Sequence, residues 1–159
     1  MKKNSPTSGG LILASLTRSS SLSHALSCES MPDRASLPAT IVFVEDDEDI
    51  GRLIRLHLET AGFTTRWFRT AMGVIAEAES HPPTLFLLDL MLPGIDGFHL
   101  CRSIRKHGLL RTVPIMVLTA AAGRRDRELA FESGADDYMT KPFRPADLVS
   151  RVRALCERR

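Results

Sequence analysis

The sequence has few cysteines, no long apolar run and almost no net charge. Its three cysteines, Cys28, Cys101 and Cys156, are widely spaced and form no C-x-x-C pair. This pattern argues against a disulfide or zinc framework and is typical of thiols in a reducing cytoplasm. The apolar stretches fall far below the ~18 residues that a membrane span needs, so we expect no membrane segment. The formal charge of +2 indicates neither a nucleic-acid-binding nor a membrane-binding surface.

Two further kinds of site are missing from the sequence. The five histidines lack the spacing of metal ligands, and no glycine-rich phosphate loop follows the first apolar segment. The segment VEDDEDIGR at residues 44–52 is acidic and repels phosphate, which argues against a nucleotide-binding enzyme. With 43% apolar residues, the 159 residues can bury one ordinary core, so we expect one domain.

The chain divides near residue 39. Residues 1–39 contain ten serines and few large apolar residues, which predicts a disordered tail. Alternatively, translation begins at Met31 and the preceding residues are an extension introduced in annotation; both alternatives stay open. The apolar segment LILASL is too short for a good signal sequence, so secretion is not indicated.

From residue 40 onward, strand-like segments alternate with segments of helical periodicity. We predict strands over residues 40–44, 63–68, 85–88, 113–119 and 136–140, and helices over residues 49–62, 71–80, 97–108, 125–134 and 145–159. The continuous apolar run LFLL is typical of a strand that is covered on both faces. The alternation predicts an α/β fold, a five-stranded doubly wound parallel sheet with five helices on its two faces.

Polar groups follow four of these strands, at ends that share one edge of a parallel sheet. Glu45 and Asp46 follow the first strand, Asp89 the third, Thr119 ends the fourth, and Lys141 follows the fifth. Crowded carboxylates repel one another unless a cation lies among them, and oxygen ligands without histidine or cysteine favour Mg²⁺. The hydroxyl and ammonium groups can bind phosphoryl oxygens. The set therefore suits attack of a carboxylate on phosphorus.

Each of these features also has a plain structural interpretation. The segment EDDED is an ordinary acidic helix start, and an aspartate after a strand often caps a turn. Thr119 alone would be an ordinary turn residue, and Lys141 alone an ordinary surface lysine. Only the combination indicates phosphoryl chemistry.

Residues 40–159 resemble the receiver domain of two-component response regulators. The resemblance rests on the acidic pair after the first strand and on the segments LLDLMLPGIDG, VLTA and GADDYMTKPF. The spacings also fit, with 43 residues from Asp46 to Asp89, 30 from Asp89 to Thr119 and 52 from Asp89 to Lys141. The resemblance implies a flavodoxin-like receiver fold with strand order 2-1-3-4-5.

The resemblance also implies a role for each site residue. Asp89 would accept a phosphoryl group from a phosphohistidine of a sensor kinase or phosphotransfer protein. Asp46, Asp89 and the Met91 backbone carbonyl would bind Mg²⁺, and Glu45 would act on the metal largely through water. Asp47 is the less favoured ligand, because the first two acids match the family positions. The chain would be a cytoplasmic signalling phosphoacceptor rather than an enzyme.

A second group of implied properties concerns switching. Thr119 and Tyr138 resemble the switch pair, in which the hydroxyl moves to the phosphate and the ring turns inward. The bond between Lys141 and Pro142 is expected to be cis. The residues two beyond Asp89 and Thr119 are Met91 and Ala121, which cannot orient water, so we expect slow self-dephosphorylation.

The last third of the chain resembles the winged-helix (OmpR/PhoB-type) subclass, which implies a homodimer through the fourth helix, fifth strand and fifth helix. The expected face carries Arg127, Glu132, Asp136, Asp137, Asp147, Arg151 and Arg153, with cross-dimer pairs Arg127–Asp147, Asp137–Arg151 and Glu132–Arg153. Alternatively these are solvated helix faces, where an ion pair contributes about 0–1 kcal/mol. The sequence ends at Arg159 without a DNA-binding domain, so we expect no direct nucleic-acid binding; a stand-alone receiver and a truncated regulator both stay open.

Two other classes of protein fit the sequence less well. An aspartate-nucleophile phosphatase requires a second carboxylate two residues after the nucleophile as general acid, but this sequence has Met91 at that position. A phosphate-independent pseudo-receiver would normally lack Asp89, Thr119 or Lys141, and all three are present.

Overall fold

The computed structural model describes residues 38–94 and 96–158. The strands are β1 (Thr40–Val44), β2 (Thr64–Phe68), β3 (Leu85–Leu88), β4 (Ile115–Thr119) and β5 (Asp137–Thr140). The helices are α1 (Glu48–Thr60), α2 (Val74–Ser80), α3 (Gly97–Lys106), α4 (Arg124–Glu132) and α5 (Pro145–Glu157). Nearly all of the predicted tail, residues 1–37, lies outside the described residues.

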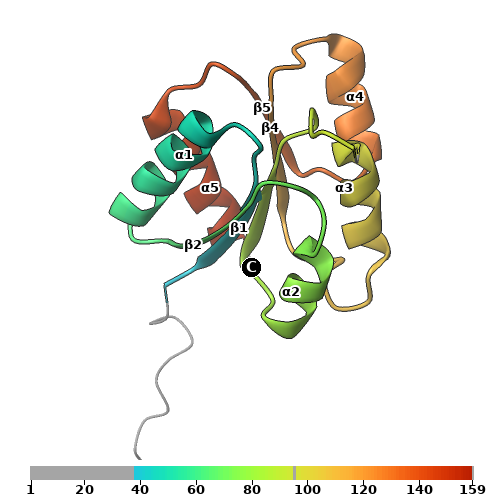
Figure 1. Ribbon diagram of the computed structural model, residues 1–159, viewed down its shortest axis with the longest axis horizontal. Helices are drawn as coiled ribbons and strands as arrows, with labels where there is room; N and C mark the ends of the chain where they lie inside the picture. Colours follow the sequence, from blue (N-terminus) through green and yellow to red (C-terminus); the bar gives the residue numbers. More distant parts are fainter. Residues whose placement is uncertain (1–37, 95, 159) are drawn as a thin grey trace, which may run out of the picture. The chain divides into compact units, whose positions relative to one another are not determined.

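The five strands form one parallel sheet in the order β2-β1-β3-β4-β5, which confirms the predicted topology. Figure 1 shows α1 and α5 on one face of the sheet and α2, α3 and α4 on the other. Within the described residues, no helix is long and apolar enough to cross a membrane.

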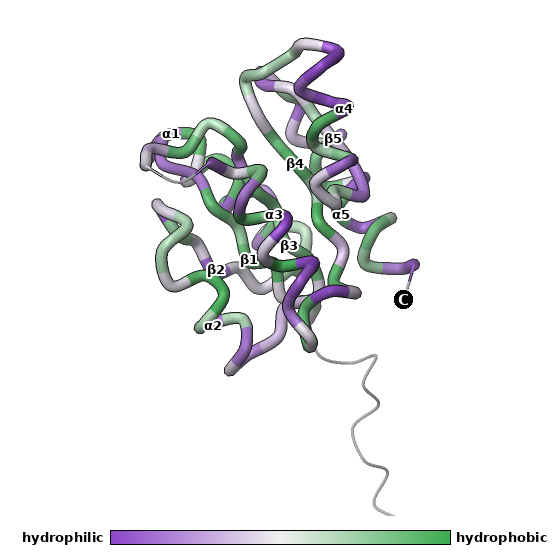
Figure 2. Tube along the Cα trace, turned by 90° about the vertical axis from the view of Figure 1, so that its right-hand side faces the viewer, coloured by the Kyte–Doolittle hydropathy of each residue, from purple (hydrophilic) through white to green (hydrophobic). Residues whose placement is uncertain are grey.

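The central strand β3 explains why its sequence is apolar throughout. Leu85 and Leu87 belong to the core under α1 and α5, whereas Phe86 and Leu88 belong to the core under α2, α3 and α4. All four side chains are buried, because successive residues of a strand point to opposite faces and both faces are covered. Figure 2 shows hydrophobic residues along the central strands, whereas hydrophobic and hydrophilic residues alternate along the helices.

Several predicted boundaries were wrong by a few residues. The second helix begins at Val74 rather than at residue 71, because Gly73 adopts a left-handed conformation (φ 79°) that interrupts helical geometry. The fourth strand begins at Ile115 rather than at residue 113, because the Val113 amide donates to the Leu110 carbonyl in a turn. The first strand and the third strand have the predicted bounds.

Candidate functional site

The register between β1 and β3 brings two acidic segments together. Val44 lies opposite Leu88, and the Asp89 amide donates to the Val44 carbonyl at 3.1 Å. The next residue of each segment is therefore fixed at the same edge of the sheet. Carboxylate oxygens of Glu45, Asp46 and Asp89 lie within 4.8 Å of one another, as the sequence predicted.

Both carboxylate oxygens of Asp89 have a hydrogen-bond donor. Oδ1 accepts from the Met91 amide at 2.9 Å, and Oδ2 accepts from Lys141 Nζ at 2.6 Å. The residue is only 4% exposed. A buried carboxylate with both oxygens engaged has a fixed orientation, which is what a nucleophile requires.

Lys141 reaches the cluster from the end of β5. Its amide donates to the Thr119 carbonyl at 2.8 Å, and the bond to Pro142 is cis, as predicted. Nζ lies 2.6 Å from both Glu45 Oε2 and Asp89 Oδ2. Burial alone would lower the pKa of Lys141, but the hydrogen bonds and charges of the two carboxylates outweigh burial and raise it. The lysine is therefore held as a cation.

The chemistry of the donor set fits a hard divalent cation. Three carboxylates and one ammonium leave a formal charge of −2, and burial raises the pKa of Glu45 despite its contact with Lys141. A cation beside Glu45, Asp46 and Asp89 would offset the repulsion among the three carboxylates, and oxygen ligands are those that Mg²⁺ prefers. A contribution of the Met91 carbonyl stays a prediction. Asp47 instead caps α1, where its side chain accepts from the amides of Asp49 and Ile50.

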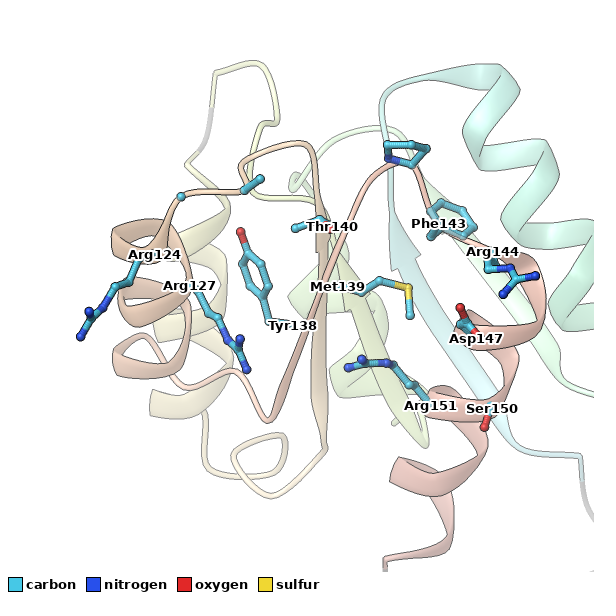
Figure 3. A pocket seen from close by; sticks show the side chains of 13 residues that line it. Arg124, Arg127, Tyr138, Met139, Thr140, Phe143, Arg144, Asp147, Ser150 and Arg151 are labelled. Atoms are coloured by element: carbon cyan, nitrogen blue, oxygen red, sulfur yellow. The ribbon is translucent and has the colours of Figure 1, made fainter.

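The two residues of the predicted switch pair converge on Ala121. Thr119 is fully buried at the end of β4, and its Oγ1 accepts from the Ala121 amide at 3.3 Å. Tyr138 is buried in the core, and its hydroxyl donates to the Ala121 carbonyl. Figure 3 shows this hydroxyl directed toward the segment before α4. Burial, followed by the charge of Asp126, raises the pKa of Tyr138.

A groove between α4 and α5 collects part of the predicted dimer face. Arg127 lines it from α4, and Asp147 and Arg151 line it from α5 (Figure 3). Arg151 donates to Asp137 of the same chain at 2.8 Å, so the predicted cross-dimer pair exists as an intrachain pair. Arg127 lies over the Phe131 ring, 5.7 Å from its centroid.

Three other residues of the predicted dimer face have different surroundings. Asp136 accepts from Arg105 of α3 at 2.6 Å and from the Ile115 amide at 2.7 Å, so its carboxylate joins α3 to β4 and β5. Arg153 donates to the Ala61 carbonyl after α1 at 3.4 Å, away from α4. Glu132 is exposed near the end of α4.

Sequence reasoning missed one residue beside the candidate phosphoacceptor Asp89. Gly97 opens α3 against the backbone that carries Asp89, and a Cβ atom placed there would lie 2.6 Å from Leu90 Cα and would also meet the Asp89 carbonyl. Only glycine allows this approach. The glycine of the IDG segment was the available signal, although a turn explains it equally well.

Comparisons with known proteins agree with this geometry. A family model described as the response regulator receiver domain matches residues 41–153. The transcriptional regulatory protein GltR from Pseudomonas aeruginosa is 41% identical over 119 residues, which are 75% of this chain and 49% of GltR. The chain thus spans about half the length of this relative.

Two solved structures are also similar. A response regulator from Chloroflexus aurantiacus is 36% identical with a TM-score of 0.73, covering 76% of this chain and 99% of that chain. The BeF3-activated N-terminal receiver domain of Klebsiella pneumoniae RstA is 36% identical with a TM-score of 0.66, covering 74% and 97%. The predicted family resemblance is confirmed: this chain belongs to the receiver domains of two-component response regulators.

Proposed function

We propose that this receiver accepts a phosphoryl group on Asp89 from a phosphohistidine of a sensor kinase or phosphotransfer protein. The observation that carries the proposal is the Asp89 carboxylate, held by the Met91 amide and by Lys141 Nζ next to two further carboxylates. Membership of the receiver family supports the same role.

The transfer is a displacement at phosphorus. A carboxylate oxygen of Asp89 attacks, the bond between phosphorus and the imidazole nitrogen breaks, and the electron pair returns to the imidazole. Lys141, already within hydrogen-bond distance of Asp89, binds a phosphoryl oxygen, and the Thr119 hydroxyl donates to another. The product is an acyl phosphate on Asp89.

Glu45, Asp46 and Asp89 would hold Mg²⁺, with the Met91 carbonyl as a further ligand. The cation supplies charge neutralisation for the phosphoryl oxygens. The chain's own contribution is a preformed cluster of oxygen donors, two of whose residues, Glu45 and Asp89, are 1% and 4% exposed.

Return to the resting state requires water to attack phosphorus and release inorganic phosphate. Met91 and Ala121, two residues beyond Asp89 and Thr119, have no side-chain group that can orient this water. We therefore propose slow self-dephosphorylation and no catalysis on a separate substrate.

Switching would begin at Ala121. When the Thr119 hydroxyl turns to the phosphoryl group, it gives up its hydrogen bond from the Ala121 amide, while Tyr138 still binds the carbonyl of the same residue. The segment before α4 is thus coupled to both side chains. We propose that the face formed by α4, β5 and α5 responds and supports a homodimer in the cytoplasm.

The test is incubation of the full chain with acetyl phosphate and Mg²⁺, followed by intact mass measurement. We expect one labile phosphoryl adduct in the wild type and in Asp49→Asn, an exposed carboxylate on α1, and none in Asp89→Asn. A folded, Mg²⁺-containing wild type without the adduct would instead identify a receiver that signals by binding alone.

A further inference from the structure

The end of β2 holds the backbone of the acidic segment that follows β1. The Glu45 amide donates to the Phe68 carbonyl at 3.0 Å, and the Glu45 carbonyl accepts from the Trp67 indole Nε1 at 2.8 Å. One residue later, the Asp46 carbonyl accepts from Arg69 Nη2 at 3.1 Å. Two consecutive residues that carry candidate cation ligands are therefore tied by three hydrogen bonds to β2 and to Arg69, the residue that follows it.

We propose that Trp67 and Arg69 are positioning residues of the cation site, an inference that rests on the proposed function of Asp89 and its neighbours. The three carboxylates Glu45, Asp46 and Asp89 outnumber the single ammonium group of Lys141, so a net repulsion before a cation binds pushes the acidic segment away from β3. The Trp67 donor of β2 and the Arg69 donor just after β2 bind the two carbonyls and resist that movement. The cluster is thereby kept ready for the cation, so less binding free energy is spent on reorganisation.

The indole of Trp67 is itself held in place by packing. Its ring stacks on Phe43 of β1, with centroids 5.7 Å apart and an interplanar angle of 10°. On α1, Gly51 faces the ring so closely that a Cβ atom there would collide with it, Cη2 lying only 2.7 Å away. Because β1 and α1 flank the acidic segment on either side, this packing aims the indole N–H at Glu45.

Arg69 makes a second tether with a different character. Its Nη1 pairs with Glu48 Oε1 at 2.5 Å while Nη2 reaches the Asp46 carbonyl, so the planar guanidinium spans the end of the acidic segment. The side chains of Arg69 and Glu48 are 58% and 48% exposed. Exposed ion pairs add little to folding stability, so a role in holding the segment can be separated from a role in folding.

The experiment uses the full chain and three single variants. Arg69→Gln removes the charged fork, Trp67→Phe keeps an aromatic ring but removes the N–H, and Arg52→Gln is the matched control. Arg52 pairs with the other oxygen of Glu48 at 3.0 Å and, in the described part of the chain, has no hydrogen bond to the carbonyl of Glu45 or Asp46. The readouts are the Mg²⁺ dissociation constant by calorimetry, amide exchange of Glu45 without metal, and the thermal unfolding midpoint.

We expect Arg69→Gln and Trp67→Phe to weaken Mg²⁺ binding about threefold to tenfold, as loss of one hydrogen bond to a held group implies. Exchange of the Glu45 amide should become faster in Arg69→Gln and in Trp67→Phe. Arg52→Gln should keep the wild-type Mg²⁺ affinity and the wild-type exchange rate. The unfolding midpoint of Arg69→Gln should stay near that of Arg52→Gln, which separates positioning from folding.

The inference is overturned if wild type binds Mg²⁺ and accepts the phosphoryl group, but Arg69→Gln and Trp67→Phe keep its Mg²⁺ affinity. It is also overturned if Arg69→Gln lowers the thermal unfolding midpoint well below that of Arg52→Gln. Weaker Mg²⁺ binding would then follow from the loss of folding stability. A wild type that binds no Mg²⁺ would remove the proposed cation site and this inference together, which distinguishes that failure from the first.

Discussion

α3 can lie close to the candidate phosphoacceptor Asp89 only because residue 97 is a glycine, whose side chain is a single hydrogen atom. Gly97 has backbone atoms of Asp89 and Leu90 where a side chain would begin, and neither can rotate out of the way as a flexible side chain would. The backbone of Asp89 and the first turn of the helix must therefore move together. A substitution here tests how strictly the position of Asp89 matters.

Gly97→Ala should destabilise the fold by about 1–3 kcal/mol, the usual cost of forcing an extra methyl group into a packed place. It should also slow phosphoryl uptake from acetyl phosphate, because the Asp89 backbone is displaced. Gly108→Ala is the matched control, since a Cβ atom at Gly108 meets nothing within 4 Å. Denaturant unfolding and intact mass measure the two effects; equal behaviour of both variants would contradict the prediction.

Tyr138 offers a second residue-scale test, since it is the sole tyrosine in the sequence. Burial raises its pKa above the usual value of 10.0, so the unfolded chain loses this proton at lower pH than the folded chain. Its contribution to stability is therefore present below pH 10 and is lost as the pH rises through the folded pKa.

Titration of the tyrosinate absorbance should give a midpoint above that of the urea-unfolded protein. Tyr138→Phe should show a shallower fall of unfolding free energy with rising pH above pH 10 than wild type does. A folded-state midpoint at or below the unfolded one would contradict the buried position of the ring.

At the scale of an element, two neighbouring acids at the start of α1 have different roles. Asp47 caps the helix by accepting from two amides at 2.9 and 3.0 Å, whereas the Asp46 carboxylate joins the candidate cation cluster. The composition of EDDED alone does not separate these roles, because every acid in it suits a helix start. The family resemblance did separate them, because it matched Glu45 and Asp46 to the ligand positions and left Asp47 out.

Asp47→Ala should lower the free energy of unfolding by about 1 kcal/mol, the typical value of an N-cap, and leave Mg²⁺ affinity close to wild type. Asp46→Asn should do the reverse. It should weaken Mg²⁺ binding strongly without loss of stability, because removing one of three crowded carboxylates relieves repulsion. Denaturant unfolding without metal measures the effect on stability, and Mg²⁺ titration measures the effect on metal affinity. If Asp47→Ala lost metal affinity and Asp46→Asn did not, Asp47 would be the ligand in place of Asp46.

At the scale of the whole molecule, the sequence was most informative where one rule determined the outcome. β3 was predicted correctly because a run of four apolar residues has one stable place in a doubly wound sheet. Asp89 and Lys141 were placed correctly because parallel strands bring their ends to one edge. Trp67 and Arg69 were missed, since their donors reach the acidic segment only through the pairing of β1 with β2 and through side-chain orientation that periodicity does not encode.

The proposed cation site links metal binding to the stability of the entire domain. Its candidate ligands Glu45, Asp46 and Asp89 follow β1 and β3, two strands that the unfolded chain does not bring together. A cation that binds only the folded state must therefore stabilise it. The free energy of unfolding should rise by about 2.7 kcal/mol when free Mg²⁺ reaches a hundred times its dissociation constant. Chelation should reverse this rise, and Asp46→Asn should shift the curve to higher Mg²⁺ concentration. A midpoint of thermal unfolding that is independent of Mg²⁺, in a protein that still gains a phosphoryl group, would mean that the three carboxylates serve phosphoryl transfer without holding the cation in the resting state.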